Sequence, residues 1–204
     1  RSRIEVPLDS GQASPWFHLD VKDTDINRDD DVREWLQDTS RRMMRLFNQS
    51  NFETEVHELY VDLVVFGTGC MFVEMGEDKQ LRCSTRHISE FYVQEDLHGM
   101  VDTVYRKYES SAKAAVQRFG EENISDHIAK VFKKNPEEPV EILHIITPRM
   151  TRDITKRDNI NMPFASIYVC SKSRMILSEG GFEEMPFIVP RFLKSTGEIM
   201  GRSP

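Results

Sequence analysis

The sequence predicts an α+β fold in which two helices precede a mainly antiparallel β region. Apolar residues first recur at three- and four-residue spacing over residues 31–49 and 52–66, which is typical of amphipathic helices. After Gly69 the pattern becomes strand-like, and turn-forming stretches such as GEDK (76–79) separate the short runs. Because the elements do not alternate regularly between strand and helix, a doubly wound parallel sheet is disfavoured.

The first part of the chain is expected to be an irregular lead-in over residues 1–30, anchored onto a core by Trp16, Phe17 and Leu19. Helix 31–49 begins after acidic residues and carries arginines further on, which suits the helix dipole. Its expected partner is helix 52–66.

A short corner, NQSN (48–51), joins the two predicted helices, with Ser50 or Asn51 as the expected N-cap of the second helix. Gly67 lies where a helix C-terminal glycine is expected. We therefore expect an antiparallel helix pair over residues 31–67.

The remaining residues, 68–200, are expected to be rich in β-strands. Strands are predicted over residues 70–75, 81–84, 90–94, 100–108, 140–147, 164–170, 174–179 and 187–193. A small helical insert over 111–134 interrupts them, with helices that end before Gly120 and Pro136. The sequence thus predicts a single α+β region over 1–204.

Composition is that of an ordinary globular protein, with 204 residues, 39% hydrophobic and 30% charged. The longest purely apolar runs, such as 63–66, are far too short for a membrane span. Three cysteines without a CxxC motif argue against a disulfide framework and a zinc site. The net charge of −7 disfavours tight binding to nucleic acid. The chain does not begin with Met, so we expect it to be cut from a longer protein.

The stretch FGTG (66–69) could in principle be a phosphate-binding turn. Walker A and Rossmann turns, however, lie between a strand and a following helix, whereas this turn follows a helix and precedes a strand. Carbonyl groups at a helix C-terminus repel phosphate. Gly67 and Gly69 are therefore predicted to form a structural corner, and no cofactor is expected.

The acidic stretch DTDINRDDDVRE (23–34) places oxygen-bearing side chains at calcium-loop spacing. Arg28 stands where that loop needs glycine and Asp30 where an apolar residue packs, so a solvated acidic loop is expected. The six histidines show no metal-ligand spacing, and no G-x-S-x-G motif occurs. Neither metal nor catalytic residues are predicted, and the protein is not expected to be an enzyme.

Three basic clusters occur, and the third, Arg149, Arg152, Lys156 and Arg157, begins where a predicted strand enters a loop. A loop between strands can reach a neighbouring subunit or DNA, so this cluster is the candidate contact site. A solvated surface is the alternative explanation for all three clusters.

Several segments together resemble a known family. They are SPWFHL (14–19), VREWL (32–36), NQSNFETEVHELYVDLVVFGTGCMFVE (48–74), EFYVQEDLHGMVDTVYRKY (90–108), EILHIITPRM (141–150), MPFIVPRF (185–192) and GRSP (201–204). In this order they resemble the N-terminal and wing region of the portal, or head-to-tail connector, proteins of short-tailed bacteriophages. Met200 stands where the family often has tyrosine.

The resemblance implies a structural subunit of a phage or prophage portal ring, usually of twelve copies, at one capsid vertex. Such a ring would let double-stranded DNA pass during packaging and ejection and would join head to tail. The implied partners are the terminase, the capsid and tail adaptor proteins, and the implied locations are the virion and, during assembly, the host cytoplasm. The stem and clip regions of the family are expected to be absent from this chain.

Two alternatives from other classes remain. A non-catalytic nucleic-acid-binding protein would have a contiguous basic face and an affinity that falls steeply with salt. A small-molecule enzyme would have a deep pocket that gathers His57, His87, His144 and acidic residues.

Overall fold

A computed structural model describes residues 16–23, 26, 29–76, 78–156 and 158–204 of the chain. Its helices are α1 (Asp30–Gln49), α2 (Phe52–Phe66), α3 (Ala112–Phe119) and α4 (Asp126–Lys134), with a short 3-10 helix at Ile88–Glu90. Its strands are β1 (Met71–Met75), β2 (Leu81–Thr85), β3 (Phe91–Glu95), β4 (Val101–Ser111), β5 (Pro139–Pro148), β6 (Phe164–Cys170), β7 (Met175–Phe182) and β8 (Phe187–Ile188). The predicted α+β class is confirmed.

The helices begin at polar side chains that satisfy free backbone N–H groups. Asp29 accepts hydrogen bonds from Asp31 and Val32 at the start of α1, and Ser125 accepts one from Ile128 in α4. At the start of α2, the hydroxyl of Ser50 accepts from the amide of Phe52 at 3.1 Å. The helix boundaries therefore lie within a residue of the predicted ones.

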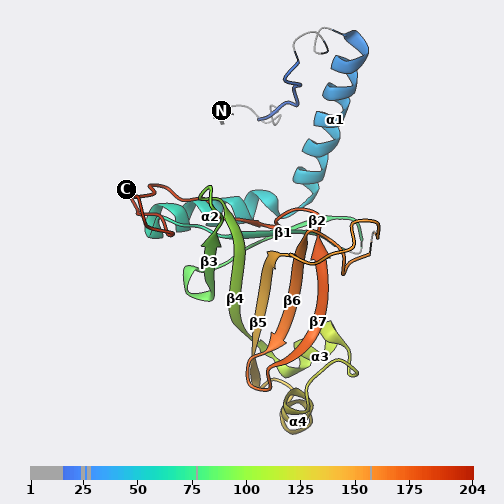
Figure 1. Ribbon diagram of the computed structural model, residues 1–204, viewed down its shortest axis with the longest axis vertical. Coiled ribbons are helices and arrows are strands. Elements are labelled where there is room, and N and C mark those ends of the chain that lie inside the picture. Colours follow the sequence, from blue (N-terminus) through green and yellow to red (C-terminus); the bar gives the residue numbers. More distant parts are fainter. Residues whose placement is uncertain (1–15, 24–25, 27–28, 77, 157) are drawn as a thin grey trace. The chain divides into compact units, whose positions relative to one another are not determined.

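The larger sheet has five strands in the order β3-β4-β5-β6-β7, and every neighbouring pair is antiparallel (Figure 1). Successive residues of β5 alternate between a buried and a half-buried face, as the two-residue period of a strand requires. Val140, Ile142, His144 and Ile146 all lie on the buried face. The predicted mainly antiparallel β region is confirmed.

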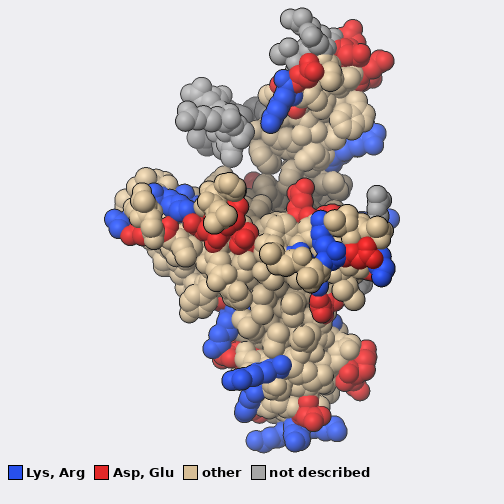
Figure 2. Space-filling view, viewed as in Figure 1, with Lys and Arg blue, Asp and Glu red and all other residues tan. Residues whose placement is uncertain are grey.

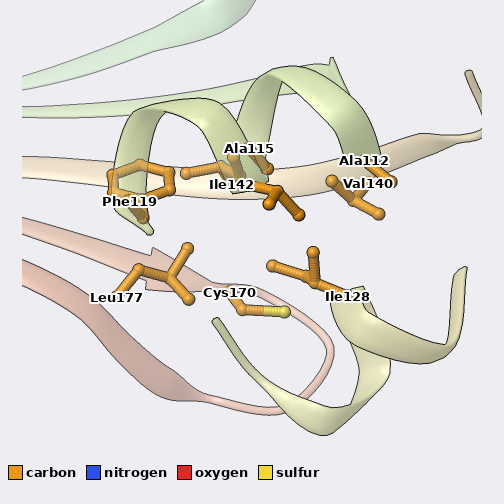
Figure 3. Close-up of a cluster of buried hydrophobic side chains, with 9 residues drawn as sticks. Ala112, Ala115, Phe119, Ile128, Val140, Ile142, Cys170 and Leu177 are labelled. Carbon is orange, nitrogen blue, oxygen red and sulfur yellow. The ribbon is translucent and has the colours of Figure 1, made fainter. Parts of the chain in front are cut away.

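Two hydrophobic clusters cover this buried face. In the first cluster, helices α3 and α4 pack against one end of the sheet. Phe119 of α3 and Leu177 of β7 lie beside Ile142 of β5 there (Figure 3). The second cluster joins β1 and β8 to the sheet through Phe72, Val104 and other apolar side chains, all of them buried.

The smaller sheet has three strands in the order β2-β1-β8, with Phe72 paired to Phe187. The strand predicted over 187–193 is wrong beyond Ile188. Pro190 has no N–H to donate to a strand ladder. Beyond it, Arg191 and Leu193 form only isolated bridges, with Thr68 and Arg202.

The contacts divide the chain into two compact units. The first contains the described residues up to Glu55 together with Glu74–Cys83, and the second contains Val56–Val73 and Ser84–Pro204. Because α1 and most of α2 belong to different units, the antiparallel helix pair stays a prediction, as does the single region 1–204.

The first unit confirms the predicted aromatic anchor. The ring of Trp16 stacks on Phe52 with centroids 5.8 Å apart, and the ring of Phe17 meets Phe47 edge-on. The amide of Leu19 donates to the hydroxyl of Ser40 on α1 at 3.0 Å. The end of the lead-in is thereby held against α1.

Candidate functional site

Three segments of the chain contact one another directly after the C-terminal end of α2. We call this set of segments the junction. It consists of residues 66–69, 189–193 and 200–204. The carbonyl of Gly67 accepts from the amide of Phe192 at 2.9 Å, and the amide of Gly69 donates to the carbonyl of Pro190 at 3.1 Å. The junction thus combines the FGTG corner with the MPFIVPRF and GRSP motifs.

Glycines are needed where the backbones of the junction approach each other. Gly67 has φ +74°, and a Cβ there would collide with backbone atoms of Arg202 and Ser203. A Cβ on Gly201 would collide with the carbonyl oxygen of Gly67. Between them, Thr68 is fully buried, and its hydroxyl accepts from the amide of Gly201 at 2.7 Å. The structure therefore places Gly67 and Gly69 at a turn built by close backbone contact.

Ion pairs hold the junction to the turn between β3 and β4. Arg191 and Lys194 both contact the carboxylate of Glu95, and both donate to the carbonyl of Gly99, at 3.1 and 3.4 Å. Hydrogen bonds from Lys194 and then from Arg191 hold the pKa of Glu95 below its usual value. The junction and this turn both belong to the second unit.

The candidate contact cluster lies on the loop 149–163, which connects β5 to β6. Arg149 is not a free cation, because its side chain is only 13% exposed and its guanidinium pairs with Glu179 at 2.8 Å. It also donates to the carbonyl of Gly180 at 3.0 Å. Arg149 therefore fastens the base of the loop to β7.

The other basic residues of the loop have different surroundings. Arg152 and Lys156 are both exposed, and Lys156 lies 3.7 Å from Asp153. Arg157 lies outside the described residues. The structure thus brings Arg149, Arg152 and Lys156 onto one loop, but two of these three cations already face carboxylates.

Apolar side chains on the same loop are strongly exposed. Met150 is 93% exposed and Ile154 is 79% exposed, and Ile160 is also exposed. The loop is held in shape by its own polar groups, since Asn161 accepts from the amide of Asp153 at 2.9 Å. A loop of this length with exposed apolar side chains is typical of a contact surface.

The face of the five-stranded sheet opposite the two clusters is also apolar, and we call it the outer face. By strand register it carries Tyr92, Tyr105, Leu143, Ile145, Ile167, Val169 and Ile176. Figure 2 shows few charged side chains over the middle of this sheet. These apolar residues are exposed or half-buried, and the same face also carries Lys107, Glu141 and Glu179. The outer face therefore combines apolar surface with a few charges.

The enzyme alternative receives no geometric support from the three histidines that it invokes. His144 is buried in the sheet at 2% exposure, whereas His57 and His87 are exposed. The ring of His144 stacks on Tyr168, with centroids 3.9 Å apart, and its Nε2 lies 3.0 Å from the hydroxyl of Ser166. Burial, helped by Arg118, Arg106 and Arg86, lowers the pKa of His144 to about 3.

In the part of the chain that the structure describes, no group of three or more His, Cys, Asp or Glu side chains is placed to hold a metal ion. None of the described helices is both long and apolar enough to cross a lipid bilayer. Of the acidic stretch 23–34, Asp25, Asn27 and Arg28 lie outside the described residues, and Asp29 caps α1.

Comparison with known proteins gives a consistent match. Residues 11–204 match the profile of the family described as bacteriophage head to tail connecting protein. The portal protein of Salmonella phage epsilon15 is 35% identical over 183 residues, which cover 88% of this chain and 33% of that protein. The probable portal protein of Bordetella phage BPP-1 is 30% identical over 195 residues, or 94% of this chain and 35% of that protein. The chain spans about a third of the length of these relatives.

Proposed function

The chain belongs to the family of bacteriophage head-to-tail connecting proteins, and we propose that it is part of a structural portal subunit. Twelve copies of the full-length subunit would form a ring at one vertex of the capsid. Double-stranded DNA would pass through this ring during packaging and ejection. The terminase, the capsid and tail adaptor proteins would be its partners, in the virion and, during assembly, in the host cytoplasm. Catalysis would have no part in this role.

The observation that carries the proposal is the family match over nearly the whole chain, including the segments that build the junction. More than a hundred residues separate the FGTG motif from the MPFIVPRF and GRSP motifs in the sequence. The three motifs nevertheless contact one another directly. A family match that covers all of these contacting segments supports a shared fold as well as a shared sequence.

A closed ring needs two different surfaces on each copy, because each subunit contacts its neighbours head to tail. The outer face and the loop 149–163 offer apolar surface for one side of this contact. We place the loop against a neighbouring copy and not against DNA. The reason is that Arg149 and Lys156 face carboxylates of their own chain, while Met150 and Ile154 expose apolar surface that phosphates would not bind.

Two substitutions on the loop distinguish a neighbouring subunit from DNA as the partner of this loop. Replacing Ile154 by glutamate is expected to lower the fraction of the whole gene product found in rings at least tenfold, because a charge would enter an apolar contact. Arg152→Gln is expected to leave that fraction within about twofold of the unmodified protein. Mass photometry at several protein concentrations measures both. Loss of rings with R152Q but not with I154E would contradict this placement.

The proposed function is tested by the mass of the whole gene product that contains this chain. Native mass spectrometry is expected to show a closed complex with a mass of twelve subunits. A product that is folded but stays monomeric over a wide range of concentrations would refute the ring.

A further inference from the structure

Helix α2 is more apolar than its contacts within this chain require. Most of its residues are apolar, but of its described side chains Leu59 alone is buried. Leu59 packs against the FGTG corner, where a Cβ on Gly69 would collide with it. About half of each side chain is exposed at Tyr60, Val61, Val64 and Val65. A helix that is apolar on several sides is normally covered by other elements, so this exposed side is a candidate contact surface.

The four exposed side chains form one continuous surface, which we call the α2 patch. Residues three and four apart on a helix are neighbours, so Val64 lies beside Tyr60 and Val61, and Val65 lies beside Val61. All four belong to the second unit. Glu58 is exposed at the edge of the patch, three residues before Val61, and the helix contains no Lys or Arg. The α2 patch is therefore apolar with an acidic edge.

The loop 149–163 has apolar side chains with the opposite charge beside them. Met150 and Ile154 are strongly exposed, and Arg152 stands between them in the sequence. The other two cations among the described residues of the loop face carboxylates of their own chain. Arg152 is exposed, and it makes no ion pair within the part of the chain that the structure describes. In apolar character and in charge, the loop is complementary to the α2 patch.

The positions of these two surfaces suit a head-to-tail contact. Each contact in a closed ring joins two different surfaces of the same chain. The α2 patch and the loop both belong to the second unit, so one body carries both. In Figure 1 the end of α2 lies on the β3 side of the five-stranded sheet, and the loop, in orange, lies on the β7 side. Each copy can therefore use one surface toward each of its two neighbours.

We propose that the α2 patch of one copy binds the loop 149–163 of the next copy in the ring. Ile154 covers the apolar side chains around Val64, and Arg152 lies at the acidic edge beside Glu58. This contact rests on the proposed portal function, and it names the two surfaces that neighbouring subunits bring together. Apolar burial supplies its affinity, and the charges at the edge fix its orientation.

Chemical crosslinking in the whole gene product tests the contact. A variant that combines Val64→Cys with Ile154→Cys is treated with a short bismaleimide, and the linked chains are separated on a denaturing gel. The native cysteines of this chain are buried, and the unmodified product gives the background. We expect a ladder of linked subunits that extends beyond dimers. Its yield should exceed that of V64C or I154C alone by roughly tenfold, because either single variant places a thiol on only one side of the contact.

A matched pair of cysteines controls for random linkage. Lys134 is exposed at the end of α4, and β5 separates this end of the sheet from the loop. Val64→Cys with Lys134→Cys should give no more linkage than V64C alone. Rings that form without a V64C/I154C ladder would overturn this contact and leave the proposed function standing. A product without rings and without ladders would refute both.

Charge reversal gives a second measurement that does not depend on crosslinking. Glu58→Lys is expected to lower the fraction of the whole gene product in rings roughly threefold or more, because it places like charges opposite each other at Arg152. Combining E58K with R152E should restore that fraction to within about twofold of the unmodified product, as mass photometry can measure. The same loss in E58K and in the combined variant would overturn this docking.

Discussion

Replacing Gly67 by alanine is expected to lower the free energy of unfolding by roughly 3 kcal/mol or more. Part of this loss comes from a left-handed backbone conformation, at φ +74°, that alanine adopts only with strain. The larger part comes from the collision of the new Cβ with the backbone of Arg202 and Ser203. Because backbone atoms cannot rotate away, residues 200–204 must move, and the hydrogen bond between Thr68 and Gly201 is lost.

Gly197 provides the matched control for this substitution. It has φ +83°, but a Cβ there would meet no atom within 4 Å. Gly197→Ala should therefore cost only the conformational strain, roughly 1 kcal/mol. Urea unfolding followed by circular dichroism measures both variants. Equal losses for G67A and G197A would show that the close contact at the junction contributes nothing.

The second large effect is a dependence of stability on pH that arises from His144. Its pKa is about 3 in the folded chain and is close to the ordinary histidine value of about 6.5 when unfolded. Between these two values the unfolded state binds the additional proton, so stability falls as the pH is lowered. The loss approaches roughly 1.4 kcal/mol for each pH unit well below 6.5.

The contribution of His144 can be isolated because it begins to act at higher pH than the carboxylates. We expect His144→Gln to lose less stability than the unmodified chain between pH 6.5 and 4.5, by roughly 2 kcal/mol. The glutamine amide can still contact Ser166, which limits other effects of the change. His98→Gln, at an exposed turn, should keep the original slope. The same slope in H144Q and H98Q would refute the assignment.

Much of the secondary structure could be predicted because the signals are local. The apolar spacing of α1 and α2, the capping serines and Gly67 each act within a few residues. The end of β8 could not be predicted in the same way. An apolar run such as FIV resembles a strand, but Pro190 stops the ladder and the chain then crosses to the FGTG corner.

The junction could not be predicted because its residues come from separate parts of the chain. The family motifs pointed to the three junction segments, but nothing in their spacing shows that Gly201 would touch Gly67. Arg106 and Arg118 show no sequence pattern either, and the structure places Arg106 over the ring of Tyr108 and Arg118 over that of Tyr168. The basic loop was visible in the sequence, whereas the pairing of Arg149 with Glu179 was not.

The central claim is that this chain is part of a ring-forming portal subunit. Negative-stain electron microscopy of the whole gene product tests it most directly. We expect closed rings with a central hole wide enough for double-stranded DNA, and class averages with twelve-fold symmetry. A well-folded product that shows only single particles without rings over a wide range of concentrations would contradict it.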